Sequence, residues 1–588
     1  MLGCLFWFAR YGFDFVDESF YLNWMARPFN YSVSSTQFGF MYHPLYQLVD
    51  GNIAALRQAN IATSFCLGLF AGWTLLGRVF GAQTINSLGR FAIAAALATS
   101  TLLSVVIIGW WLPTPSYNSL VFQGLLVAAT GLILADRTTT PRSILGWVLI
   151  ATGGWLTFMG KPPSAAALFV ISAIYLLFSG SFRVKCMLVA CALTVALIIL
   201  SALLIDGSIM AFIERLRNGA AMAGNLHSRY SFAGMFRLED LVLQKNTKSA
   251  LFFSAATVFF VMWLTWVETG AFKLLAQILS ATGAALGVFI AVQYFPLQST
   301  SGEHRALLTL SAPLGVAFLG LVIALIGDRA RIARPQWVLL FTLLLLPYAY
   351  AFGTGNNYWS FIGSAAVFVV LSALIVLGPI AMHPKLEPIL LVFGISVQTI
   401  VALQVIHSLA SPYAQKQPLA ENDVVIDVGV PGASLTLSSD HARYISSAHK
   451  IADQAGFRRG TPVIDLSGFT PGLIYVLGGD AIGMAWTVGG QPGTREFVIQ
   501  SLRKVPCNQL AVAWVLTEPL GPIAISPEVL ASFGANMVAD FEMVGTINSP
   551  ELGPAFGYSG GRQQKLYKPS RPREDAIAVC ETAKRNSS

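Results

Sequence analysis

The feature that most limits the fold of this chain is a series of long apolar runs with few charges, repeated through residues 1–410. Each run is about 17–25 residues long, which is the length that a helix needs to cross the hydrocarbon layer of a membrane. Charged residues make up only 11% of the 588 residues, against roughly 25% in a soluble domain. We therefore expect a polytopic α-helical membrane protein.

The first apolar stretch, Met1–Gly12, is short and has no small-residue cleavage site after it, so we interpret it as a short or truncated first helix and not as a cleaved signal peptide. Counted with it, about 13 membrane helices are predicted. The other predicted helices are Ala59–Phe80, Phe91–Trp110, Tyr117–Ala135, Ser143–Met159, Ser164–Ser179, Cys186–Ile205, Ala250–Val267, Leu274–Phe295, Ala306–Ile326, Trp337–Phe352, Phe361–Ile380 and Pro388–Leu409.

Basic residues gather in alternate short loops, which predicts the orientation because such loops remain in the cytoplasm. These basic residues are Arg78, Arg90, Arg137, Arg142, Arg183, Lys185, Lys273, Arg329, Arg331, Arg334 and Lys385. The loops at 13–58 and 206–248, and the chain after residue 410, then lie on the exported side. We expect a multi-pass protein of a bacterial inner membrane, with its site and C-terminal domain in the periplasm. The net charge of +8 is spread over these loops, which argues against a nucleic-acid-binding patch.

Residues 411–588 differ from the rest in being richer in polar residues, Pro and Gly. Short strands and helices alternate there, which predicts a small exported α/β domain. The expected elements are strands at Val424–Val428, Pro462–Leu466 and Ala511–Leu516, a helix at Ser439–Ala455 and a helix start at Thr470–Leu477. Cys507 and Cys580 are the two cysteines of this domain. We expect them to form a disulfide in an oxidising compartment, with two free thiols as the alternative.

Acidic residues cluster in the first exported segment. Asp14, Asp17, Glu18 and Tyr21 are spaced 0, 3, 4 and 7, which would place them on one face of a helix. Three acids on one face would raise one another's pKa, as in sites that handle a proton or a cation. The alternative is a solvated helix start, with Asp17 as N-cap and Glu18 in the first turn.

Cationic residues follow at the exported ends of several helices. Pro44 after His43 predicts an extended or turn conformation. Arg57 opens the next membrane helix, where it could hold a lipid phosphate bidentately or simply reach toward the interface. Lys161 ends another helix, and His304 and Arg305 lie in a further exported loop. Together with the acids, these cations predict a pocket for an anionic lipid headgroup.

These motifs resemble those of the GT-C glycosyltransferases, and most nearly the protein O-mannosyltransferase and lipid A aminoarabinose transferase superfamily (glycosyltransferase family 39-like). The resemblance lies in an Asp-Glu pair followed by Tyr, in His43-Pro44-Leu45, and in the positions of Arg57, Lys161 and Arg305. Ala306 stands where that superfamily has Tyr, and a single Pro follows His43, so the sugar and the acceptor stay open.

The resemblance implies a polyprenyl-phosphate sugar as donor and a hydroxyl of an envelope glycan, lipid or protein as acceptor, with no cofactor or metal. The phosphate leaving group, with a second pKa of about 6, departs as an anion when cations stabilise it. Asp17 would be the general base and Glu18 would position it or share its role. The donor and acceptor would be bound by Asp14, Tyr21, His43, Arg57, Lys161, His304 and Arg305. A single displacement would invert the anomeric centre.

Other functions remain open from the sequence. A transporter or flippase of lipid-linked sugars could use the same charges, although the predicted site lies in exported loops and no inverted repeat is visible. An O-antigen polymerase or ligase depends on arginines in long exported loops. An Asp-Glu pair in the first loop fits such an enzyme less well. In a structural membrane protein, the acidic residues of the first exported segment would have no chemical role. Neither a P-loop nor a nucleophile elbow is present in the sequence.

Overall fold

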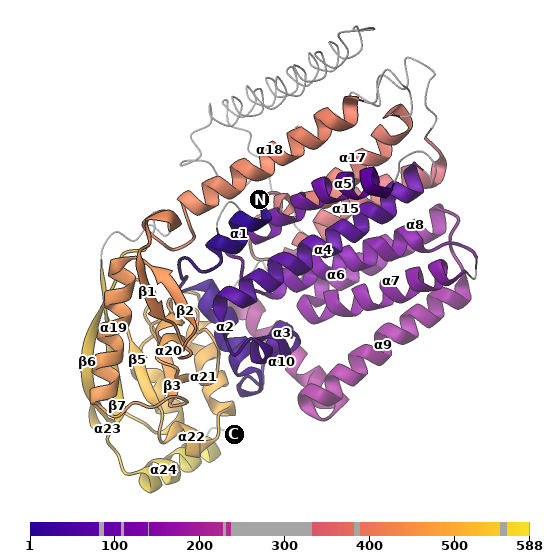
Figure 1. Cartoon of the computed structure of the whole chain (residues 1–588). Coiled ribbons are helices and arrows are strands. Elements are labelled where there is room, and N and C mark those ends of the chain that lie inside the picture. Colours follow the sequence, from indigo (N-terminus) through magenta and orange to yellow (C-terminus); the bar gives the residue numbers. More distant parts are fainter. Residues whose placement is uncertain are drawn as a thin grey trace.

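The computed structural model describes residues 1–80, 87–106, 111–138, 140–226, 231–236, 332–381, 388–552 and 561–586. It contains a bundle of long helices and, at one end of the bundle, a domain of strands and short helices (Figure 1). This is the predicted fold class, a polytopic α-helical protein with a C-terminal α/β domain. Three predicted spans lie outside the described residues: Ala250–Val267, Leu274–Phe295 and Ala306–Ile326.

Seven helices in the described part of the chain are long and apolar enough to cross a membrane. They lie at Ile53–Val79, Ser87–Val105, Tyr117–Leu134, Pro141–Gly160, Val184–Asp206, Tyr358–Gly378 and Phe393–Ala410. Each coincides with a predicted span, and the first apolar stretch forms only the seven-residue helix α1, Leu2–Phe8. The bundle is built from α4 (Ile53–Val79), α5 (Ser87–Ala98), α6 (Tyr117–Leu134), α7 (Pro141–Gly160), α8 (Pro162–Phe178), α9 (Val184–Asp206), α15 (Arg334–Ala351), α17 (Ala366–Ala381) and α18 (Pro388–Ala410).

Small residues let the central helices approach closely. A Cβ added to Gly131 of α6 would lie 2.7 Å from the carbonyl oxygen of Gly146 in α7, and one added to Gly153 would lie 2.6 Å from the carbonyl oxygen of Gly124. Such contacts replace the hydrophobic driving force that helices lack inside lipid. Helix α9, at the edge of the bundle (Figure 1), is instead mostly exposed and strongly apolar, as a lipid-facing helix must be.

Residues 13–58, which we name the first exported segment after their predicted side of the membrane, form α2 (Asp17–Ala26), a 3₁₀ turn at Pro28–Asn30 and α3 (Phe38–Leu48). The extended conformation predicted at His43 is wrong, because Pro44 lies inside α3. Proline removes one backbone hydrogen bond there, but tertiary contacts hold the helix. The Nδ1–H of His43 donates to the Met25 carbonyl at 2.6 Å, and the Tyr42 hydroxyl donates to Gln123 at 3.0 Å.

The second exported segment begins with α10, Ile209–Leu226, which packs against the first segment. The guanidinium of Arg215 donates to the Asp206 carboxylate at 2.5 to 3.1 Å and to the Tyr31 carbonyl. A Cβ at Gly219 would lie 2.3 Å from the backbone of Ser34 and Ser35. Helix α10 is therefore fixed to the first segment through its described residues.

The C-terminal domain, which we name the exported domain after its predicted side of the membrane, has a five-stranded mixed sheet in the order β4-β3-β5-β7-β6 and a separate hairpin. The hairpin is β1 (Val424–Asp427) and β2 (Ser434–Leu437). In the sheet, β3 (Pro462–Leu466), β4 (Asp480–Ala481) and β5 (Trp514–Thr517) are parallel, and β6 (Phe541–Ser549) and β7 (Arg562–Pro569) are antiparallel to their neighbours. The α-helices of the described residues here are α19 (Ser439–Gln454), α20 (Gly472–Val476), α21 (Thr494–Lys504), α22 (Cys507–Leu510), α23 (Met537–Asp540) and α24 (Arg573–Asn586).

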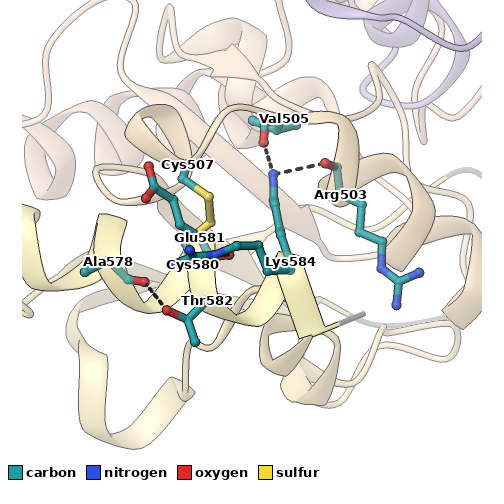
Figure 2. The surroundings of a disulfide bond; sticks show 9 residues. Arg503, Val505, Cys507, Ala578, Cys580, Glu581, Thr582 and Lys584 are labelled. Atoms are coloured by element: carbon teal, nitrogen blue, oxygen red, sulfur yellow. Dashed lines mark hydrogen bonds between the residues drawn. A yellow bond between two sulfur atoms is a disulfide. The ribbon is translucent and has the colours of Figure 1, made fainter. Parts of the chain in front are cut away.

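A disulfide joins Cys507 of α22 to Cys580 of α24, with the two Cα atoms 5.8 Å apart (Figure 2). This is the pairing that the sequence predicts. Beside it, the Lys584 ammonium donates to the carbonyls of Arg503 and Val505. The disulfide and these bonds tie the C-terminal helix to the body of the exported domain.

Candidate active site

The backbone of the acid loop, residues 12–18, is held by its own carboxylates. Asp14 accepts the N–H groups of Val16 and Glu18 at 2.9 Å each, and Glu18 accepts the N–H of Asp14 at 3.0 Å. These bonds satisfy N–H groups where α2 begins, a position at which helix donors otherwise lack partners. Asp14 thus precedes α2, so the prediction that it shares one helical face with the other acids is wrong. Asp17 is also not the N-cap, which is Val16.

The carboxylate of Glu18 is buried against Arg57. Nε and Nη2 of Arg57 donate to Oε1 and Oε2 at 2.8 and 2.7 Å, and Thr114 also donates its hydroxyl to Oε1. The remaining guanidinium N–H groups donate to the carbonyls of Ala9, Tyr11 and Gly12. All five donors of Arg57 are therefore used within the protein. The predicted contact of Arg57 with a lipid phosphate is thus replaced by its contact with Glu18, which fixes the acid loop on α4.

Asp17 differs from its two acidic neighbours because its side chain is only half-buried. The Tyr413 hydroxyl, just beyond the last membrane helix, donates to its carboxylate. Burial raises the pKa of Asp17, and the Tyr413 bond partly offsets this rise. Burial, and then the nearby charge of Asp17, raise the pKa of Asp14 well above its usual range. The two acids therefore retain a proton at a higher pH than isolated carboxyls would.

Lys161 lies on the other side of an aromatic cluster. It stands between α7 and α8, where its buried ammonium donates to the Tyr350 carbonyl at 2.7 Å. Nζ lies 6.0 Å from the ring centroid of Tyr117, and that ring lies 6.0 Å from the ring of Tyr21. Burial lowers the pKa of Lys161 to about 7. A chain of neighbouring side chains thus runs from Asp17 through Tyr21 and Tyr117 to Lys161.

The exported domain packs against the acid loop. Gly12 donates its N–H to the Thr436 carbonyl at 3.0 Å, and Gly472 donates to the Phe15 carbonyl at 3.1 Å. The Phe15 ring stacks on His441, with centroids 5.4 Å apart and an interplanar angle of 10°. The ring of Tyr444 packs at its edge, at 5.2 Å. The acids are therefore held between α4 and the exported domain.

The structure brings together Asp14, Asp17, Glu18, Tyr21 and Arg57, and places Lys161 beyond Tyr117. His43 lies elsewhere, on the wall of an open cavity, and His304 and Arg305 lie outside the described residues. Sequence reasoning missed Tyr413 as a partner of Asp17. Its signal is weak: a lone tyrosine after Ser411-Pro412, where the last membrane helix has ended.

Comparison with known proteins finds no matching family model and no matching curated protein. Two solved structures match, both of ArnT from Cupriavidus metallidurans. The structure of the apo state is 12% identical with a TM-score of 0.37, and the structure bound to undecaprenyl phosphate is 13% identical with a TM-score of 0.39. Each alignment covers 96% of both chains.

Proposed function

We propose that this chain is a membrane glycosyltransferase of the GT-C type, which moves a sugar from a polyprenyl phosphate to an acceptor hydroxyl on the exported side of the membrane. The observation that carries the proposal is the series of neighbouring side chains that links Asp17, through Tyr21 and Tyr117, to Lys161. A proton acceptor and a cation, separated by apolar rings, suit a reaction that deprotonates a hydroxyl and releases an anion.

In this reaction the acceptor oxygen attacks the anomeric carbon, and the bond from that carbon to the phosphate oxygen breaks. The bonding electron pair leaves with the polyprenyl phosphate, and the hydroxyl proton moves to the Asp17 carboxylate. A raised pKa suits Asp17 to this role, because a base is most effective when its pKa lies near the working pH. Lys161 stabilises the departing phosphate charge. One displacement inverts the anomeric centre.

The neighbouring acids act on Asp17 indirectly. Asp14 orders the start of α2 through two backbone hydrogen bonds, and Glu18 fixes the loop to α4 through Arg57. Both are positioning residues. We assign phosphate binding to Lys161, and we propose the same role for His304 and Arg305. His43 is assigned to the acceptor side. The basic loops favour a position of these groups on the periplasmic side of a bacterial inner membrane.

Transfer by purified, detergent-solubilised protein tests the function. Polyprenyl-monophosphate and polyprenyl-diphosphate sugars are supplied in parallel, with a crude cell-envelope fraction as acceptor, and the configuration of the new linkage is determined by NMR. We expect transfer from a monophosphate donor with inversion.

Transfer from the diphosphate donors alone would favour a polymerase or ligase. A second candidate, a flippase, is tested with liposomes that contain the protein. Movement of the lipid-linked sugar across the bilayer, with no donor consumed in the first assay, would overturn the transferase proposal.

A further inference from the structure

A cavity of about 730 Å³ opens between the first exported segment and the exported domain. It lies within the volume range of ligand sites. The α2 end and the 3₁₀ turn supply one wall (Asn23 to Tyr31), the α3 end supplies the second (His43 to Gly51), and the exported domain supplies the third (Gly429, Arg459, Tyr475 and Gly478 to Ala481). We call it the junction cavity.

We propose that the junction cavity binds the neutral carbohydrate part of the acceptor. This inference rests on the proposed function and adds a substrate class and a place to it. Helix α2 connects the two sites: Asp17 is its first residue, and Asn23 and Ala26 near its end line the cavity. At 1.5 Å per residue the separation along the helix is about 9–14 Å. That distance suits an acceptor that reaches Asp17 with one hydroxyl and extends away through further sugar rings.

Aromatic side chains at the cavity indicate a sugar. Phe29 lines the cavity and is 65% exposed. Its ring packs edge-on against His43, with centroids 6.2 Å apart, and this contact fixes its orientation. Deeper in the cavity, the hydroxyls of Tyr46 and Tyr475 lie 3.2 Å apart. A pyranose offers a face of C–H groups for such rings and hydroxyls at its edge for the phenols.

The charges of the lining favour a neutral ligand. Two cations, Arg27 and Arg459, are matched by two acids, Asp50 and Asp480. Arg27 already donates to Asp480 at 3.0 Å, and Arg459 donates to the Gly429 carbonyl at 3.2 Å. A phosphate or an acidic glycan would meet acids as well as cations here. Planar polar groups on the same walls, such as Asn30 and Gln47, can bind sugar hydroxyls instead.

A peptide fits the cavity less well. Extended peptides usually add to an exposed sheet edge, and the edge strand at the cavity, β4, has only the two residues Asp480 and Ala481. Among the described residues, the lining also lacks a cluster of aliphatic side chains of the kind that anchors peptides, since Val430 is the largest aliphatic residue among them. A glycan is thus the occupant that the lining favours.

Direct binding is tested by saturation-transfer NMR on the full-length protein in detergent, with the neutral oligosaccharide pool released from the cell envelope by mild acid. We expect signals from sugar ring protons. They should fall by about tenfold, the effect of roughly 1.4 kcal/mol, in Phe29→Ala and in the cavity-filling variant Asn30→Trp. Asp17→Asn, which acts at the other site, should keep them. Leu520→Ala is the matched control, because Leu520 is 84% exposed in the exported domain and lies outside the lining.

Kinetics separate this inference from the proposed function. In a transfer assay, Phe29→Ala and Asn30→Trp should raise the acceptor KM by about tenfold, with the donor KM and the saturated kcat close to wild type. Three results would overturn the cavity assignment. Sugar signals could persist in both variants, they could be absent from the wild type, or inorganic phosphate could displace them. Sugar binding that both cavity variants abolish, without transfer by any form of the protein, would support the cavity and reject the transferase.

Discussion

Both carboxylate oxygens of Glu18 face the guanidinium of Arg57, at 2.8 and 2.7 Å from Nε and Nη2, and both side chains are buried. The other three N–H groups of Arg57 donate to backbone carbonyls of residues 9, 11 and 12. A single side chain at the start of α4 therefore holds both ends of the acid loop. The position of Asp17 depends on this pair, although neither member of it touches the substrate in the proposed reaction.

Breaking the pair should destabilise the protein. Arg57→Ala leaves a buried carboxylate without its partner, and such a loss costs about 3–5 kcal/mol. We expect a clear fall in the thermal unfolding midpoint of the purified protein, and a smaller fall for Arg57→Lys, which keeps the charge and loses the bidentate geometry. The Glu18→Gln/Arg57→Ala double variant should lose less stability than the sum of the two single losses, because the two residues interact. An Arg57→Lys protein with unchanged stability and a raised donor KM would instead restore Arg57 to phosphate binding.

The pH dependence of transfer should report Asp17 and Lys161. Asp17 works as a carboxylate, so activity is lost as the pH falls through its raised pKa, at a higher pH than for an ordinary aspartate. Lys161 works as a cation, so activity is lost as the pH rises through its pKa of about 7. A plot of kcat/KM for the donor against pH should be bell-shaped, because this ratio reports the free enzyme.

Two comparisons check the alkaline limb. Lys161→Arg should move it to higher pH, because arginine stays charged. The alkaline limb of the kcat profile should also lie at higher pH than that of the kcat/KM profile, because a bound phosphate favours the charged form of Lys161. An alkaline limb that stays near pH 7 in Lys161→Arg would show that Lys161 is not the titrating group.

The stacking of Phe15 on His441 predicts that the exported domain controls catalysis by positioning the acid loop. Phe15→Ala should lower kcat by about tenfold or more, because small displacements of a catalytic group are costly. Phe15→Tyr keeps the ring and should recover most of the rate. The donor KM, which depends on Lys161, should change little in either variant. A general loss of folding would lower the thermal midpoint and raise both KM values, and that pattern would contradict a positioning role.

The disulfide between Cys507 and Cys580 spans 73 residues. By loop-closure entropy, a cross-link of this span stabilises the folded domain by about 4 kcal/mol. Cys580→Ser should therefore lower the thermal midpoint, and a reductant should lower that of the wild type but not that of the variant. Peptide mapping without reduction should recover the linked peptides. Free thiols at both positions in protein taken from its native membrane would contradict the exported placement of this domain.

The membrane bundle was predictable because hydrocarbon imposes length and composition on every span. Helices such as α6 and α9 fall within two residues of their predicted bounds. The exported domain was predicted only in part. Strands β1, β3 and β5 have apolar residues that mark them, but β6 and β7 are largely polar and partly exposed. Their hairpin has little periodic signal, so sequence reasoning passed over it.

The structure groups several of the predicted site residues, but it gives some of them, such as Arg57, other contacts than the sequence predicts. The sequence shows that Arg57 is cationic and lies near a membrane surface. The hydrogen-bond acceptors that its guanidinium meets depend on the path of the chain between α1 and α2, and the sequence does not show that path. The partners of Asp17 and Phe15, which are Tyr413 and His441, lie about 400 residues away along the chain. Spacing on one helix cannot reveal such contacts, and this is why the acid loop's dependence on the exported domain emerged only from the fold.

The most direct test of the account is the single-turnover rate of sugar transfer by Asp17→Asn, measured at saturating donor and acceptor. Asp453→Asn is the control, since Asp453 is an exposed acid of the exported domain. We expect Asp17→Asn to lose about 10²- to 10⁴-fold in rate, the usual contribution of a general base, while it folds and binds donor like the wild type. The control should keep the wild-type rate. A folded Asp17→Asn protein that transfers sugar at the wild-type rate would contradict the central claim.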